Sequence, residues 1–103
     1  MKKVIRFDKR AEKEFRKFPR VVQVKAKILF DVLERDGRLE EPYGKKLDSN
    51  LFEIRLKSNG QWRILYAYLI GKEIIILSAF QKKTQQTPLK ELKKTRERMK
   101  IYK

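Results

Sequence analysis

Apolar residues follow two different spacings along the chain, and the changes of spacing mark its structural elements. Residues 3–7 alternate apolar and basic side chains, which predicts a short strand with one face inward. Asp8 follows as a candidate N-cap, and apolar residues then recur at helical spacing at Ala11, Phe15 and Phe18. Pro19 cannot continue a helix, so we expect the first helix to end there.

A longer helix is predicted directly after Pro19. Its apolar side chains form two adjacent rows, which together would make one wide buried stripe. The rows are Val21, Val24, Ile28 and Val32, and beside them Val22, Ala26, Leu29 and Leu33. Gly37 suits a left-handed C-cap, so the helix is expected to end there.

The second half of the chain predicts strands and a final helix. Residues 38–48 contain Pro42 and Gly44 and are expected to form a loop. Two strands are expected in residues 51–68, and residues 73–80 are apolar enough to form the most buried strand. The last helix would have Thr87 as N-cap and Pro88 in its first turn, with Leu89, Leu92 and Met99 on one side. The predicted order is β-α-α-β-β-β-α, an α+β domain with an antiparallel meander and helices mainly on one face.

The register of the hairpin in LFEIRLKSNGQWRILYAY, residues 51–68, can be predicted from its alternation. A two-residue turn at Asn59-Gly60 would place Arg63 among the apolar side chains. A three-residue loop that begins at Ser58, with Gly60 in the left-handed position, would instead place Arg55 opposite Arg63. We expect this second register because it puts the apolar residues of both strands on one face: Phe52, Ile54, Leu56, Trp62, Ile64 and Tyr66.

The expected register creates a directly opposed pair of like charges. Arg55 and Arg63 would repel each other by roughly 0.2–1 kcal/mol, with Lys57 and Glu53 on the same face. Glu53 could offset part of this repulsion. One interpretation is an ordinary solvated sheet face, and the other is a concave basic patch that holds phosphate. In a strongly basic protein we favour the phosphate patch.

Composition narrows the classes of function. The 103 residues are 41% apolar, which is enough for a single domain (residues 1–103) with one modest core. With 28 Lys and Arg against 13 Asp and Glu, the net charge is +15, so nucleic acid is the leading class of partner. No segment approaches the roughly 20 apolar residues of a membrane-spanning helix, so we expect no membrane partner. The N-terminal residues lack the apolar centre of a signal peptide, so we expect a cytoplasmic protein.

The chain contains neither Cys nor His, which excludes disulfides, zinc sites with these ligands and histidine acid-base chemistry. Any catalysis must therefore use carboxylate, Lys, Arg, Tyr or hydroxyl side chains. We expect no metal and no cofactor.

Three motifs together resemble a known family. The motifs are LFEIR, then WRILYAY, then FQKKTQQTP, and a basic C-terminal helix follows them. This combination is similar to the RelE/HigB superfamily of type II toxin-antitoxin toxins, in particular to its phage-derived, HigB-like branch. The resemblance covers essentially the whole chain. It implies a compact sheet-and-helix fold of the microbial-ribonuclease type, cleavage of mRNA in the ribosomal A site, and inhibition by a cognate helix-turn-helix, HigA-like antitoxin.

The resemblance also implies roles for five residues. Arg55 and Arg63 match basic strand positions that bind phosphate and stabilise the extra negative charge of the transition state. Lys82 and Lys83 match basic residues at the cleft edge, where one of them could protonate the leaving oxygen if nearby cations lower its pKa from about 10.4. Glu53 is a candidate general base for the 2′-hydroxyl, and an equally good alternative is a salt bridge that balances the arginines.

Further residues are candidates for RNA binding. Lys57 lies beside the arginine pair, and Phe80 could stack on a base or belong to the core. Residues 82–103 contain nine basic and two acidic side chains, a net of +7. The last helix, with Lys90, Lys93 and Lys94, would then lie along an RNA backbone, be covered by an acidic antitoxin segment, or simply be solvated.

Two alternatives keep the fold without the cleavage. One is a toxin like ParE, which poisons DNA gyrase, and the other is a catalytically silent RNA-binding module. The two basic strand residues, Arg55 and Arg63, favour the nuclease.

Overall fold

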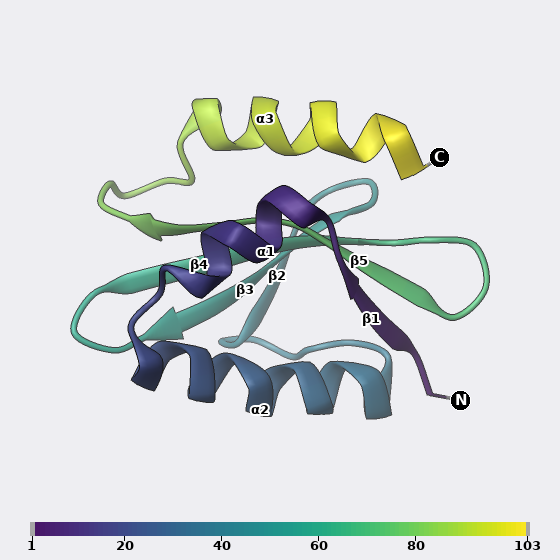
Figure 1. The fold of residues 1–103 in the computed structure, drawn as a ribbon, viewed down its shortest axis with the longest axis horizontal. Helices are drawn as coiled ribbons and strands as arrows, with labels where there is room; N and C mark the ends of the chain where they lie inside the picture. Colours follow the sequence, from purple (N-terminus) through teal and green to yellow (C-terminus); the bar gives the residue numbers. More distant parts are fainter. Residues whose placement is uncertain (1, 103) are drawn as a thin grey trace.

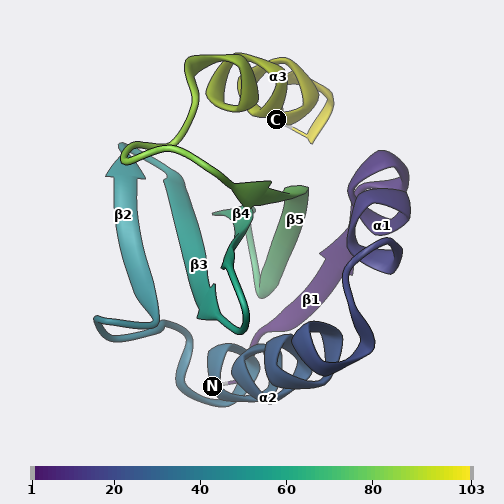
Figure 2. The same ribbon diagram turned by 90° about the vertical axis from the view of Figure 1, so that its left-hand side faces the viewer.

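The computed structural model describes residues 2–102, which form one five-stranded sheet with helices on both sides (Figures 1 and 2). The spatial order of the strands is β1-β5-β4-β3-β2. The elements in chain order are β1 (Val4–Phe7), α1 (Lys9–Arg16), α2 (Arg20–Asp36), β2 (Gly44–Asp48), β3 (Leu51–Lys57), β4 (Gln61–Tyr68), β5 (Glu73–Lys82), α3 (Leu89–Met99) and the 3-10 turn η1 (Lys100–Tyr102). Within these residues no helix is long and apolar enough to cross a membrane.

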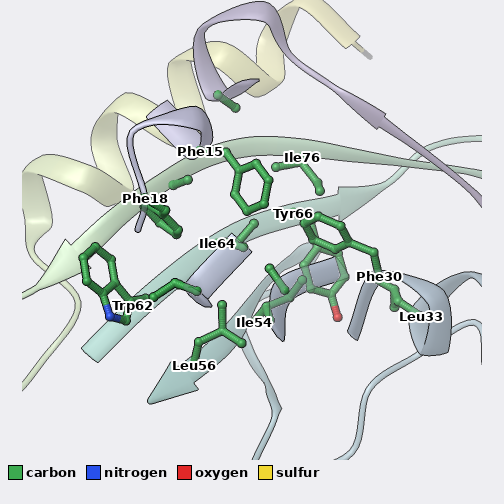
Figure 3. Close-up of a cluster of buried hydrophobic side chains, with 14 of the residues drawn as sticks. Phe15, Phe18, Phe30, Leu33, Ile54, Leu56, Trp62, Ile64, Tyr66 and Ile76 are labelled. Atoms are coloured by element: carbon green, nitrogen blue, oxygen red, sulfur yellow. The ribbon is translucent and has the colours of Figure 1, made fainter. Parts of the chain in front are cut away.

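The first face of the sheet carries the larger core, which lies under α1 and α2 (Figure 3). Phe15 and Phe18 from α1 and its end meet the sheet there, and the Phe18 ring lies 4.9 Å from Trp62 between centroids. Phe30 and Leu33 of α2 pack on the same face. The apolar face predicted for the hairpin therefore packs against these helices and forms the sheet side of this core.

The second face is covered by α3, whereas α1 and α2 share the first face, so the helices lie mainly on one face, as expected (Figure 2). The second face needs its own helix because the central strands are apolar on both sides. Leu65 and Ala67 of β4 and Ile75 and Leu77 of β5 are fully buried, and they point away from α1 and α2. These side chains need a second apolar cover, which α3 and η1 supply through Leu92, Met99 and Tyr102.

Only one of the two apolar rows predicted for α2 faces the core. Val22, Ala26 and Leu33 are fully buried, whereas Val21, Val24 and Ile28 are 54%, 51% and 60% exposed. The prediction of one wide buried stripe is therefore wrong. A single helix laid on a sheet buries only the side chains along its line of contact, and the neighbouring row remains in solvent.

Residues 44–48 form the edge strand β2, although a loop was predicted there. The segment pairs antiparallel with β3, from Gly44 opposite Ile54 to Asp48 opposite Leu51. Gly44 is required at its start because an added Cβ would lie 2.7 Å from the Cβ of Leu39. The observed order is thus β-α-α-β-β-β-β-α. The sheet is also mixed rather than a pure antiparallel meander, because β1 runs parallel to β5.

The predicted hairpin register is confirmed. Arg55 is opposite Arg63, and Lys57 is opposite Gln61, which leaves a three-residue loop between the strands. Gly60 has a positive φ of 142°, which side chains other than glycine rarely adopt, as expected for this position of the loop. Asn59 before it also has a positive φ, of 52°, which an Asn side chain tolerates.

The helix α3 is held against the sheet by buried polar contacts. The guanidinium of Arg98 donates two hydrogen bonds to the carboxylate of Glu14 on α1, both of 2.9 Å, and one to the carbonyl of Leu77. Ser78 and Thr95 share a buried hydroxyl hydrogen bond of 2.7 Å. These contacts fix the position of α3 along the sheet.

The predicted start of α3 is wrong in one detail. Pro88 occupies the N-cap position without a side-chain hydrogen bond, and the Thr87 hydroxyl, expected to be the cap, is bonded to Glu53 of β3 instead. Leu89 is 81% exposed, so only Leu92 and Met99 of the predicted apolar side contact the core.

Asp8 connects the two ends of the chain. Its buried carboxylate caps α1 and accepts hydrogen bonds from the side chains of Arg10 and Tyr102, at 2.7 Å in each case to Oδ2. Burial opposes ionisation of Asp8, but these hydrogen bonds and those from two backbone amides outweigh it and hold the pKa of the carboxyl well below its usual range.

We expect Asp8→Asn to lower the free energy of unfolding at neutral pH by about 1–2 kcal/mol, because the cap and the charged hydrogen bonds are weakened. A carboxyl with a depressed pKa stabilises the fold above its unfolded pKa of about 3.9 and loses that contribution as pH falls further. The difference from wild type should therefore shrink below pH of about 4. Urea unfolding at several pH values, with the exposed Asp31→Asn as control, measures this; a difference independent of pH would contradict it.

Candidate functional site

The opposed arginines of β3 and β4 share one carboxylate. Glu53 lies on the same face of the sheet and is 2% exposed. Its Oε1 accepts a hydrogen bond of 3.0 Å from Nε of Arg55 and lies 3.8 Å from Nε of Arg63. The negative charge between the two guanidinium groups offsets the repulsion that the register creates.

The second oxygen of Glu53 is also engaged. Thr87, in the segment between β5 and α3, donates its hydroxyl to Oε2 at 3.0 Å. Figure 2 shows this segment crossing the end of the sheet before α3 begins. Glu53 therefore has both oxygens occupied by neighbouring side chains, and these contacts favour the salt-bridge interpretation of this residue over the general-base interpretation.

The two arginines differ in exposure and in hydrogen bonding. Arg63 has a side chain only 6% exposed, and it is fixed by hydrogen bonds to the Trp62 carbonyl at 2.9 Å and to Gln61 at 3.3 Å. Burial lowers the pKa of the Arg63 guanidinium, which nevertheless stays charged at neutral pH. Arg55 is 30% exposed. The pair thus combines one fixed cation with one that solvent or a ligand can reach.

Two adjacent cavities meet at these arginines. The first, which we call the hairpin pocket, has a volume of about 380 Å³ and is lined by Pro42, Tyr43, Arg55, Leu56, Lys57, Gln61 and Arg63. The second, the loop pocket, has a volume of about 660 Å³ and is lined by Arg55, Gln61, Arg63, Lys82, Lys83, Thr84 and Gln85. Because three residues line both, the two pockets form one cleft with a cationic centre.

Lys82 is an amine of the cleft whose pKa is lowered. It lies at the end of β5, opposite Gln61. Burial lowers the pKa of the Lys82 ammonium, and the charges of Arg63, Arg55 and Lys45 lower it further against the opposing effect of Glu53. A lysine with a lowered pKa transfers protons more readily near neutral pH.

A model of one protein family matches residues 13–100, that of the phage-derived proteins like Gp49. The chain belongs to the Gp49-like family. No curated protein sequence matches it.

Solved structures show which fold this Gp49-like protein has. It is similar to a mutant of the Escherichia coli toxin RelE in the free state, with a TM-score of 0.75 and 21% identity over 96% of this chain and 99% of that one. It is also similar to a chain of the RelBE2 toxin-antitoxin complex of Mycobacterium tuberculosis, with a TM-score of 0.60 and 22% identity over 80% of this chain and 100% of that one. The RelE-like fold expected from the sequence motifs is confirmed.

The fold of the Gp49-like protein brings most of the predicted site residues together. Those that line the cleft or lie directly beneath it are Glu53, Arg55, Lys57, Arg63, Lys82 and Lys83. Phe80 is opposite Arg63, but its ring is partly buried and packs in the core under α3.

The predicted basic residues of α3 lie outside both pockets. Lys90 and Lys93 are exposed. Lys94 forms ion pairs with Glu14 at 3.0 Å and Glu91 at 2.7 Å, and so helps to hold α3 against α1. Contact of these three lysines with RNA stays a prediction.

No site role was predicted for Gln61 and Tyr43, which line the cleft, or for Thr87, which bonds to Glu53. Gln61 follows from the register, since it is opposite Lys57, and this signal was present in the alternation. Thr87 was read as a helix cap, and Tyr43 fell in a predicted loop. No local pattern connects either of them with Glu53 or Arg55.

We expect Thr87→Val to reduce the free energy of unfolding by about 1–3 kcal/mol, because the buried carboxylate of Glu53 loses a hydrogen-bond donor. Thr87→Ser should restore most of the loss. In a Glu53→Gln background the same Thr87→Val change should cost less, since a neutral acceptor needs the donor less. Urea unfolding of the single and double variants measures this coupling, and strictly additive effects would show that the bond does not contribute.

Proposed function

We propose that this Gp49-like protein is the toxin of a type II toxin-antitoxin system and that it cleaves mRNA without a metal. The observation that carries the proposal is the cleft itself, in which Arg55, Arg63, Lys82 and Lys83 surround a space open to solvent, while the buried Glu53 holds the arginines in place. A cluster of fixed cations is what a phosphodiester and its more highly charged transition state require.

Cleavage would proceed through attack of the 2′-hydroxyl oxygen on the adjacent phosphorus, while the proton of that hydroxyl passes to a water molecule. The O–P bond to the 5′-oxygen breaks, and that oxygen takes a proton. Arg55 reaches the phosphate from β3 and Arg63 stabilises the phosphorane from β4, while Lys83 contacts the neighbouring phosphate. Lys82 is the proton donor, and its lowered pKa supports this role. Glu53 positions the arginines rather than touching the substrate.

The proposed partners follow from the resemblance and the charge. The ribosome would hold mRNA in its A site and so supply the positioning that the weak acid-base groups of this protein need. Lys57, Lys90 and Lys93 would contact the RNA backbone, and a helix-turn-helix antitoxin would neutralise the toxin. We therefore expect the protein to act in the cytoplasm, where its substrate is translated.

We expect Arg55→Ala and Arg63→Ala to lower the single-turnover rate of mRNA cleavage on programmed ribosomes by about 10²–10³-fold each, the usual effect of removing one transition-state donor. Arg35→Ala, at the exposed end of α2, is the matched control and should cleave like wild type. Full cleavage and toxicity in folded arginine variants would contradict the site. DNA damage on induction without new mRNA ends would favour the gyrase-poisoning alternative.

The role of Lys82 predicts a pH dependence. The protonated amine is the acid, so the cleavage rate should fall as pH rises through its pKa, which lies below the ordinary value of about 10.4. Lys82→Arg keeps the charge but is a poor proton donor, so its rate should be about 10²–10⁴-fold lower and should lack this alkaline fall. Lys72→Arg, in the turn before β5, is the control. An unchanged profile in Lys82→Arg would assign the proton to another group.

A further inference from the structure

The hairpin pocket is larger than phosphate binding requires. Its volume of about 380 Å³ falls in the range of pockets that hold small molecules, and a phosphate held between Arg55 and Arg63 would occupy only its border with the loop pocket. Besides the polar Lys57 and Gln61, the remaining lining consists of Pro42, Tyr43 and Leu56. These three residues offer an apolar surface directly beside a cationic one.

Tyr43 is unusual among the aromatic residues of the protein. Among residues 2–102 it is the one aromatic side chain that is more than half exposed, at 55%. The other rings, such as Phe15, Trp62 and Tyr66, are packed in the cores. An exposed aromatic side chain at the wall of a cavity has apolar surface available to a ligand.

The backbone places Tyr43 next to the arginine pair. The carbonyl of Tyr43 accepts a hydrogen bond of 2.8 Å from the amide of Arg55, so the two residues are opposite each other where β2 begins. Tyr43, Arg55 and Arg63 therefore lie side by side across the sheet, immediately before β2, in β3 and in β4. Gln61 lies at the same border, and because its Oε1 accepts from Arg63, its amide nitrogen remains able to donate.

We propose that the hairpin pocket binds the nucleobase next to the phosphate held by Arg55 and Arg63, with the base stacked on the ring of Tyr43. Gln61 would donate to a carbonyl of that base. Stacking on an aromatic side chain accepts any base, because every base has a π face. Tyr43 thus replaces the partly buried Phe80 as the stacking residue. This inference rests on the proposed function, since it assumes that the cleft binds RNA.

The test uses a short oligoribonucleotide that carries 2-aminopurine and 2′-O-methyl sugars, which lack the nucleophile for cleavage. Stacking quenches the fluorescence of 2-aminopurine, so wild type should quench it on binding. Tyr43→Ala should lose the quenching and bind about tenfold more weakly, the usual effect of removing one stacking partner. Tyr43→Phe should bind and quench like wild type, because the ring is retained.

Two controls separate stacking from phosphate binding. An oligonucleotide of the same length with an abasic site in place of 2-aminopurine should bind wild type and Tyr43→Ala equally. Ile70→Ala, at an exposed position in the turn between β4 and β5, should bind both oligonucleotides like wild type. Circular dichroism checks that each variant is folded.

The outcomes distinguish this inference from the proposed function. Wild-type binding without quenching, or equal quenching by Tyr43→Ala, would overturn the base pocket even if Arg55→Ala and Arg63→Ala still abolish mRNA cleavage. Loss of quenching in Tyr43→Ala together with full cleavage by the arginine variants would support the base pocket and overturn the nuclease site. Equal weakening of the abasic oligonucleotide by Tyr43→Ala would also overturn stacking, since no base is present to stack.

Discussion

The carboxylate of Glu53 is the interaction on which the architecture of the cleft depends. The hairpin register forces Arg55 and Arg63 to be opposite each other, and Arg63 has almost no access to water. A buried guanidinium beside a second cation is costly unless an anion lies within reach. Glu53 supplies that anion, and its other oxygen holds Thr87, so the same group also positions the segment that walls the loop pocket.

The two-sided core determines where a cleft can exist. On the face under α1 and α2, packed aromatic side chains cover the sheet. On the other face, α3 covers the sheet over only part of its length. The bidentate contact of Arg98 with Glu14 fixes where α3 lies along the sheet. The basic ends of β3, β4 and β5 lie beyond that cover, which leaves Arg55, Lys57 and Lys83 open to solvent and to a polyanion.

Much of the fold could be predicted because its signals are local. The helices and the strands of the hairpin follow from periods of 3.6 and 2, and the register follows because one slip would exchange the two faces of the sheet. The errors arose where local pattern is weak. The edge strand β2 is short and polar outside Leu47, and the exposed row of α2, with Val24 and Ile28, is indistinguishable in sequence from a buried one.

For the candidate site, the sequence by itself determined that Arg55 is opposite Arg63 with Glu53 and Lys57 on the same face, because side-chain alternation along two paired strands leaves no other arrangement with an apolar core. Only the tertiary structure decided that Thr87 bonds to Glu53 and that Tyr43 lines the cleft. These contacts join segments far apart in the chain, and their distances depend on where α3 and the edge strand pack, which no local spacing encodes.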